Sequence, residues 1–158
     1  VSLTIVAVRR NLATALAPQD KSLNFLNNIL AKQESLRAGA FDGLLLNADG
    51  KVTESTTSNV FFVTAGRLCT PAVACGILDG ITRHVVLSLA REAGIPTEEG
   101  FYDPQHVRDA VECFLTNATM ELMPVREIDH VSIGSGKPGG VTVRLHRLFR
   151  SKLDSFLE

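Results

Sequence analysis

The chain has 158 residues, of which 45% are hydrophobic and 21% are charged, as expected for one soluble globular domain. Its 16 basic and 17 acidic residues nearly balance, and no apolar stretch is long enough to span a membrane, so the composition favours neither nucleic acid nor a membrane as a partner. Cys69, Cys75 and Cys113 fit neither a disulfide framework nor a zinc site, which indicates a reducing, cytoplasmic location.

The first half of the chain is predicted to form one helix among several strands. Residues 3–8 are rich in β-branched residues and predict a strand. Residues 23–37 place Leu23, Leu26 and Leu30 at helical spacings, and Gly39 is expected to end that helix. Further strands are expected at residues 43–46, 51–53, 59–63 and 67–70, with a hairpin turn at 47–50 because Asp-Gly tolerates the positive φ of a tight turn.

The second half is predicted to alternate helices with strands and loops. Residues 71–80 are expected to form a loop, followed by a helix at 82–93. Asp103 and Pro104 predict the N-cap and the first residue of a short helix. Strands are expected at 96–101, 111–116, 123–125 and 130–133, and a last helix at 142–157 after a glycine-rich loop at 134–140. This mixture indicates an α/β or α+β domain.

Three segments contain residue types that catalysis or ligand binding can use. KSLNFLNN (21–28) puts Lys21 at the mouth of a helix, where the positive end of the helix dipole disfavours a charged amine. VTESTTSNVF (52–61) puts Glu54 before four hydroxyl residues, between two strands. GILDGITR (76–83) leads through Gly80 into a helix whose first N–H groups can bind an anion. Each feature alone is more typical of a solvated lysine, a polar turn or an ordinary helix start than of a functional site.

These segments, followed by FLTNATMELMPV (114–125), resemble in order and spacing the class IV family of pyridoxal-phosphate enzymes. The family includes branched-chain aminotransferases, D-amino acid aminotransferases and aminodeoxychorismate lyases. The resemblance covers nearly the whole chain and implies the larger, C-terminal domain of fold type IV, with a mixed β-sheet or barrel-like core and flanking helices. Residues 1–158 are therefore expected to form one cofactor-binding domain, with the smaller N-terminal domain of the family absent from this chain.

The resemblance also implies how the matching residues bind pyridoxal 5'-phosphate. Lys21 is expected to form the internal aldimine and to move the α-proton. Glu54 is expected to pair with the pyridine nitrogen, because a protonated ring is the better electron sink. Leu78 is expected to lie against the ring. The residues expected on the phosphate side are Ile81, Thr82, Ala118 and Thr119.

The chain departs from the family pattern at a few positions. Relatives often have serine or threonine where Asn117 and Ala118 stand, and often tyrosine where Phe25 stands. The arginine that relatives direct at the phosphate comes from the smaller domain. Elsewhere, Arg83 is expected to face solvent or pair locally, the histidines to lie on surfaces, and the lysines other than Lys21 to face solvent.

The resemblance implies an aminotransferase that acts on an amino acid and a 2-oxo acid, as a homodimer and without a metal ion. The glutamate run ends in SNVF instead of the GEN form common in branched-chain enzymes, which shifts the expectation toward D-amino acid aminotransferases or lyases. One alternative is an aminodeoxychorismate lyase that releases pyruvate and 4-aminobenzoate. The other is a folded but non-catalytic fragment.

Overall fold

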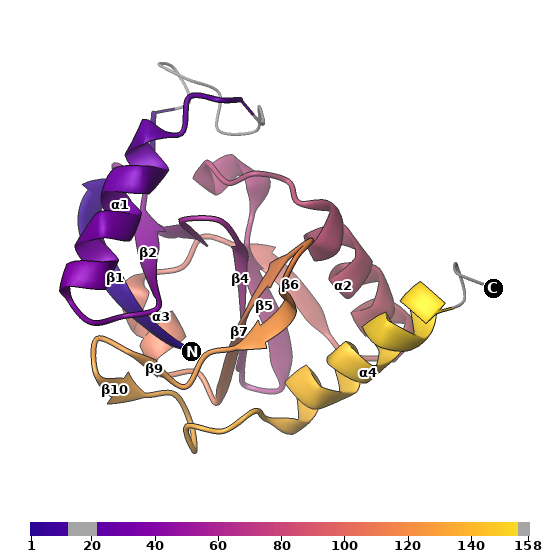
Figure 1. Cartoon of the computed structure of the whole chain (residues 1–158). Helices are drawn as coiled ribbons and strands as arrows, with labels where there is room; N and C mark the ends of the chain where they lie inside the picture. Colours follow the sequence, from indigo (N-terminus) through magenta and orange to yellow (C-terminus); the bar gives the residue numbers. More distant parts are fainter. Residues whose placement is uncertain (13–21, 155–158) are drawn as a thin grey trace.

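A computed structural model describes residues 1–12 and 22–154 of the chain. Within them the strands form two five-stranded sheets, with α1 on one side of the molecule and α2 and α4 on the other (Figure 1). Both sheets mix parallel and antiparallel pairs. The architecture confirms the predicted α/β class.

The first sheet has the strand order β10-β9-β1-β2-β3. Its central strand β1 (Ser2–Arg9) is parallel to both of its neighbours, β2 (Asp42–Leu46) and β9 (Glu127–Ile128). The outer strands β3 (Val52–Ser55) and β10 (Val131–Ser132) are antiparallel to their partners. Helix α1 (Leu26–Arg37) packs on β1 and β2.

Helix α1 approaches this sheet closely. A Cβ on Gly43 of β2 would lie 2.8 Å from Val6 Cγ1 and 3.2 Å from the Ala31 carbonyl oxygen. So close a contact favours small side chains, and Ala31 and Ser35 of α1 are buried there. The third buried residue of the helix is Asn28. The predicted helix is therefore corrected in two ways. It begins at Leu26 instead of Leu23, and the leucines at helical spacing, Leu23, Leu26 and Leu30, are exposed.

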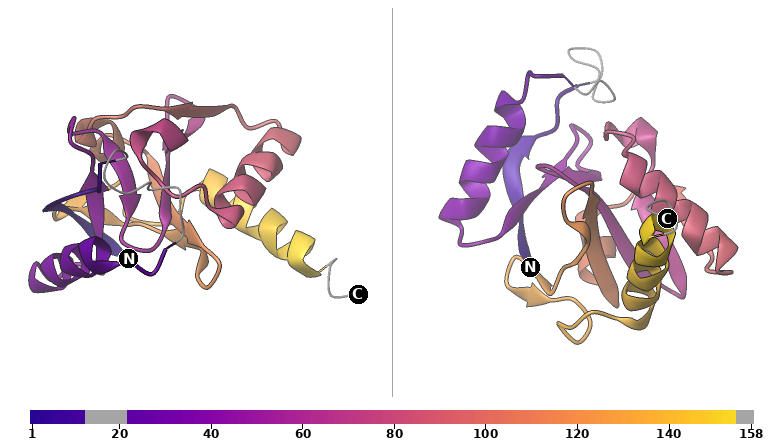
Figure 2. Two further views of the ribbon diagram at one scale, coloured as in Figure 1. Left: turned by 90° about the horizontal axis from the view of Figure 1, so that it is seen from above. Right: turned by 45° about the vertical axis from the view of Figure 1, so that its right-hand side comes forward.

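The second sheet has the strand order β6-β5-β4-β7-β8. Strand β4 (Asn59–Thr64) is antiparallel to β5 (Arg67–Pro71) and β7 (Glu112–Asn117). Strand β8 (Glu121–Pro124) is antiparallel to β7, whereas β6 (Thr97–Gly100) is parallel to β5. Helices α2 (Ile81–Glu92) and α4 (Gly140–Asp154) lie side by side against this sheet (Figure 2).

Strand β4 is buried on both faces, which explains its continuous apolar sequence. Val60 and Phe62 belong to the core that the two sheets share, whereas Phe61 and Val63 belong to the core beneath α2 and α4. The cysteines are buried as well. Cys113 belongs to the core that the two sheets share, and burial raises the pKa of its thiol to about 12.

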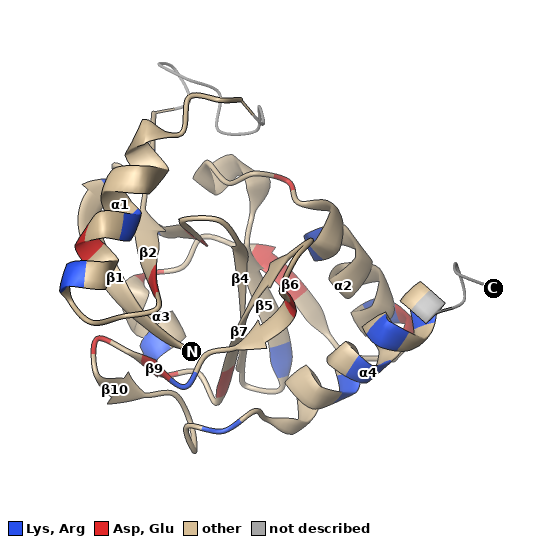
Figure 3. Ribbon diagram, viewed as in Figure 1, with Lys and Arg blue, Asp and Glu red and all other residues tan. Residues whose placement is uncertain are grey.

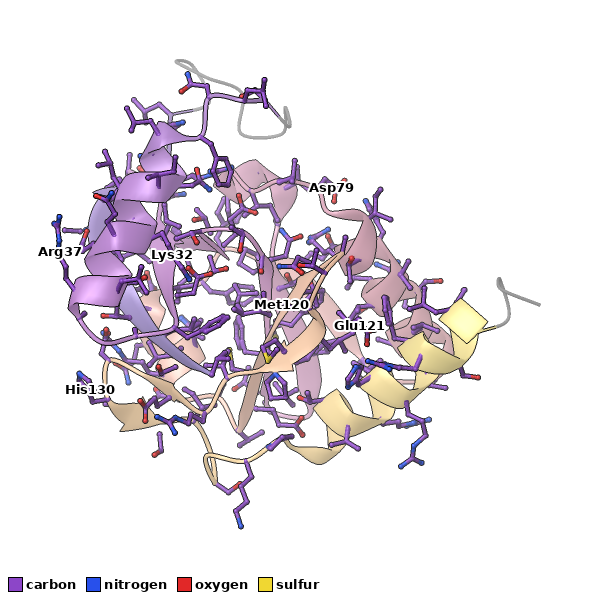
Figure 4. The ribbon with its side chains drawn as sticks, viewed as in Figure 1. Lys32, Arg37, Asp79, Met120, Glu121 and His130 are labelled. Atoms are coloured by element: carbon purple, nitrogen blue, oxygen red, sulfur yellow. The ribbon has the colours of Figure 1, made fainter. Side chains whose placement is uncertain are left out.

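Two glutamates from the second sheet fix α4. Glu112 of β7 accepts hydrogen bonds from the backbone N–H groups of Val141 and Thr142 at 3.0 and 2.8 Å. Glu121 of β8 lies beside the middle of the helix, where its Oε2 is 2.8 Å from His146 Nε2 and accepts a hydrogen bond from an arginine of α4 (Figure 4). Basic residues recur along α4, and the other charged residues are scattered over the remaining elements (Figure 3).

The other predicted elements fall close to their observed positions. The short helix α3 (Pro104–Arg108) begins with a capping box formed by Asp103 and His106, which confirms the predicted N-cap. The expected loop at 71–80 contains a short 3₁₀ turn (Val73–Cys75), and β9 was not predicted because two residues carry no periodic signal. None of the described helices has the length and apolar character that a membrane span requires.

Candidate active site

A cavity of about 920 Å³ opens where several chain segments converge. These are the end of β1, the start of α1, the turn from β3 to β4, the residues before α2 and the turn after β7. Five of the residues singled out by sequence line it: Glu54, Leu78, Ile81, Thr82 and Ala118. Thr119 is not among the lining residues. Lys21 lies outside the described residues, although the next residue, Ser22, lines the cavity.

Glu54 is a buried carboxylate near the end of β3, with 5% of its surface exposed. Its Oε2 accepts hydrogen bonds from Asn59 Nδ2 and from the backbone N–H of Leu78, both at 3.1 Å. Its Oε1 lies 2.7 Å from Nη2 of Arg10. Within the part of the chain that the structure describes, three donors, one of them charged, therefore favour the ionised form of this group.

Arg10 is a site residue that the sequence analysis missed. Besides its contact with Glu54, it donates from Nε to the Gly76 carbonyl at 3.1 Å and from Nη1 to Asn28 Oδ1 at 3.0 Å. One weak sequence signal exists: a basic residue directly after a half-buried strand needs an acidic partner if it is buried. Nothing in the sequence identified Glu54 as that partner.

Asn59 links Glu54 to the start of α2. Its Nδ2 bridges the Glu54 carboxylate and the Leu78 carbonyl oxygen, which is 2.8 Å away. A Cβ on Gly80 would lie 2.2 Å from Asn59 Oδ1. Glycine at position 80 therefore allows the helix to begin directly against this amide.

The N-terminus of α2 faces the cavity without a side-chain cap from the described residues. Its N-cap is Gly80, and the next two residues, Ile81 and Thr82, line the cavity. The Ile81 side chain is 84% exposed, so this residue can contribute to a site mainly through its backbone N–H. Uncapped N–H groups and the positive end of the helix dipole together favour an anion at this point.

Arg83 holds the first turn of α2 in place. The expectation that it faces solvent is wrong, because the residue is 1% exposed, whereas local pairing is confirmed by a 3.1 Å contact with Asp79. Asp79 lies just before the helix (Figure 4). Arg83 also donates to the Pro71 carbonyl and to Glu99 Oε2, at 3.0 and 2.5 Å. These contacts tie the start of α2 to β5 and β6.

The turn after β7 places only some of its polar groups at the cavity. Thr116 and Asn117 line it with Ala118. Asn117 Oδ1 accepts hydrogen bonds from the N–H groups of Thr119 and Met120, at 2.9 and 2.7 Å, and lies 3.1 Å from the Thr119 hydroxyl. The Thr119 hydroxyl is thus engaged within the turn. Asn117, at a position where relatives often have serine or threonine, organises that turn.

The arrangement suits a particular kind of ligand. The cavity falls within the range of about 300–1,000 Å³ typical of small-molecule sites. It offers a buried carboxylate for a basic nitrogen and a helix N-terminus for an anionic group, with the apolar Leu78 beside the carboxylate. The described residues contain no group of three or more side chains arranged to hold a metal ion.

Comparisons with known proteins identify the family of the chain. The profile of the family described as "Amino-transferase class IV" matches residues 1–128. The D-alanine aminotransferase of Listeria monocytogenes serotype 4b (strain F2365) is 40% identical over 129 residues, which cover 82% of this chain and 44% of that protein. The aminodeoxychorismate lyase of Bacillus subtilis (strain 168) is 31% identical over 153 residues, covering 97% and 52%.

Solved structures of aminotransferases share the fold of this chain. The branched-chain amino acid aminotransferase from Thermobaculum terrenum, in its PLP-bound holo form, superposes with a TM-score of 0.92 at 38% identity, covering 95% of this chain and 50% of that one. The chain therefore spans about half the length of the relatives that it matches.

Proposed function

Because the chain belongs to the class IV aminotransferase family, we propose that it binds pyridoxal 5'-phosphate in an enzyme that transfers an amino group between an amino acid and a 2-oxo acid. One observation carries the proposal. A single cavity contains both a buried carboxylate with three donors and a helix N-terminus that no described side chain caps. These two features complement a ring nitrogen and a phosphate.

The proposal gives each cavity residue a binding role. Glu54 receives the ring nitrogen, and Leu78, whose N–H donates to that carboxylate, is the apolar contact for the ring. The N–H groups of Ile81 and Thr82, with the Thr82 hydroxyl, receive the phosphate. Ala118 borders the cavity but has no polar side-chain atom. The arginine that relatives direct at the phosphate is proposed to come from a further domain, and the enzyme is proposed to be a homodimer.

The chemistry divides between the cofactor and the protein. When bound, pyridoxal phosphate supplies an electron sink for the carbanion that forms when the amino acid loses its α-proton. The Lys21 amine is proposed to attach the cofactor and to accept and return that proton. Glu54 keeps a proton at the ring nitrogen, and the helix start holds the phosphate so that the reacting atoms stay in register.

Reductive labelling tests the assignment of Lys21. The full-length protein is loaded with pyridoxal phosphate, reduced with borohydride and mapped by peptide mass spectrometry. The expected result is a label on Lys21 and none on Lys32, Lys51, Lys137 or Lys152. Label on one of these other lysines would refute the assignment, whereas Lys21→Ala should abolish labelling.

The substrate pair decides between two activities. The SNVF run, which stands in place of the GEN form common in branched-chain enzymes, favours a D-amino acid as amino donor. The second candidate is an aminodeoxychorismate lyase, favoured by 31% identity over 153 residues to such an enzyme. Two assays distinguish these activities. A panel of D- and L-amino acids with 2-oxo acids measures transamination. Incubation with aminodeoxychorismate and no added 2-oxo acid measures the lyase, because only a lyase then releases pyruvate.

A further inference from the structure

Arg10 is a buried cation at the cavity to which the proposed function has so far assigned no role. Its side chain is 10% exposed, and Nη2 contacts Glu54 Oε1 at 2.7 Å. Its Nε and Nη1 are held by the Gly76 carbonyl and by Asn28. Asn28 is in turn fixed by a 2.7 Å hydrogen bond from Nδ2 to the Thr56 carbonyl. Among the described residues, the guanidinium is therefore held by Glu54, Asn28 and the Gly76 carbonyl.

This anchoring bears on where a shared proton resides. A carboxyl group and a ring nitrogen that share one proton exist either as carboxylate and pyridinium or as two neutral groups. A cation in direct contact with the carboxylate stabilises its charged form, and the effect is stronger in a buried site. The same cation repels a protonated nitrogen, but less, because Coulomb energy falls with distance and the carboxylate is its direct contact.

We propose that Arg10 is a positioning residue that keeps the shared proton on the ring nitrogen of the cofactor and off Glu54. The inference rests on the proposed function, in which Glu54 meets that nitrogen. Asn59 and the Leu78 backbone orient Glu54 through neutral donors, whereas Arg10 brings a full positive charge. If Arg10 only supported the fold, replacing it would leave this proton where it is.

Nitrogen NMR of the holoenzyme measures the proton directly. The full-length protein is loaded with pyridoxal phosphate labelled with ¹⁵N in the ring, and the parent is expected to show a protonated ring nitrogen. In Arg10→Met the resonance should move toward the unprotonated range. Arg10→Lys keeps the charge but cannot make all three contacts, so it should recover part of the difference. Arg67→Met, which breaks an exposed 3.1 Å pair with Glu98 outside the cavity, should leave the resonance unchanged.

The outcomes separate this inference from the proposed function. A fully protonated nitrogen in Arg10→Met would overturn the inference. If Glu54→Gln also leaves the resonance unchanged, Glu54 is not the ring partner and the proposed function fails as well; if Glu54→Gln alone shifts it, only the inference fails.

A second measurement decides the matter if Arg10→Met loses the cofactor. The ¹³C resonance of the Glu54 carboxyl group is recorded in the cofactor-free parent and variant at the same mildly acidic pH. A shift toward the protonated carboxyl in the variant supports the inference, and an unchanged carboxylate resonance contradicts it.

Discussion

Helices α2 and α4 lie side by side on the same sheet, but their N-termini are satisfied differently. At the start of α4, Glu112 accepts two backbone N–H groups and the Thr142 hydroxyl, the last at 2.7 Å. At the start of α2, no described side chain caps the helix, and its first residues border the cavity. The start of α4 is therefore neutralised by a carboxylate of the protein, whereas the start of α2 is open to an anionic ligand.

The difference shows how one physical device serves two purposes. A helix start needs acceptors for its first N–H groups and favours negative charge there. Where the chain supplies a carboxylate, the result is a structural joint between α4 and β7. At the start of α2 the N-cap is Gly80, which has no side chain, and Arg83 ties the first turn to Pro71 and Glu99. The result is a preformed site for an anionic ligand.

The largest effect is expected from Gly80→Ala. The added Cβ would lie 2.2 Å from Asn59 Oδ1, which forces the amide away from Glu54 and from the Leu78 carbonyl. Overpacking typically costs about 1–3 kcal/mol. Because the strain falls on the amide that lines the cavity, affinity for pyridoxal phosphate should fall by the corresponding factor, roughly fivefold to 150-fold. Absorbance titration measures the change. Gly140→Ala at the start of α4 is the matched control, because a Cβ there meets nothing within 4 Å. Equal losses of cofactor affinity in Gly80→Ala and Gly140→Ala would contradict the distinction between the two helix starts.

Glu112→Ala is expected to have the opposite signature. It leaves the first N–H groups of α4 without their acceptor, which should lower the free energy of unfolding by about 1–2 kcal/mol. Affinity for pyridoxal phosphate should stay at the parent value, because Glu112 does not line the cavity. Denaturant unfolding and cofactor titration are measured on the same variant. A large loss of affinity with unchanged stability would reverse the roles assigned to the two helices.

Thr82→Val tests the hydroxyl at the start of α2. It preserves the shape of the side chain and removes one donor to the phosphate, a change worth about 0.5–1.5 kcal/mol, or roughly twofold to tenfold in affinity. The control is Thr142→Val in the first turn of α4, whose hydroxyl contacts Glu112. That variant should lose stability and keep its affinity. If both threonine variants bind the cofactor like the parent, the Thr82 hydroxyl does not contact the phosphate.

The smallest effect is expected at Glu121, which anchors the middle of α4. The hydrogen bond to His146, with that from Arg150, lowers the pKa of Glu121 from its ordinary value of 4.5. A lowered pKa means that this contribution to stability is present above pH 4.5 and is lost as the pH falls through the folded-state value. Glu121→Gln should therefore cost less than about 1 kcal/mol at neutral pH, and the difference from the parent should shrink as the pH falls below 4.5. A difference that grows below that pH would contradict this sign.

The sequence predicted the cavity residues best where they lie in short contiguous motifs. Glu54, Leu78, Ile81, Thr82 and Ala118 were chosen from motifs, and the structure brings them to one cavity, although their roles stay predictions. The site residue that was missed, Arg10, lies in no such run. Its significance comes from contacts with Asn28, Glu54 and Gly76, which arise only when the fold brings together the end of β1, α1, β3 and the loop before α2.

Two further wrong predictions show that periodicity alone does not determine which residues are buried. The spacing in α1 predicted a helix but not its buried face, because the close approach at Gly43 selects small side chains over leucines. Arg83 occupies a helix position that is commonly solvated. It is buried because Glu99 of β6 and the Pro71 carbonyl reach it from other elements, and no local pattern encodes those contacts.

An NMR titration shows which helix start receives the phosphate. Amide resonances of the full-length protein are followed as pyridoxal phosphate is added, with Ile81 and Thr82 reporting on the start of α2 and Val141 and Thr142 on the start of α4. We predict that the α2 amides shift on binding while the α4 amides, already bonded to Glu112, do not. Binding that leaves the Ile81 and Thr82 amides unmoved, or that moves both helix starts equally, would contradict the account.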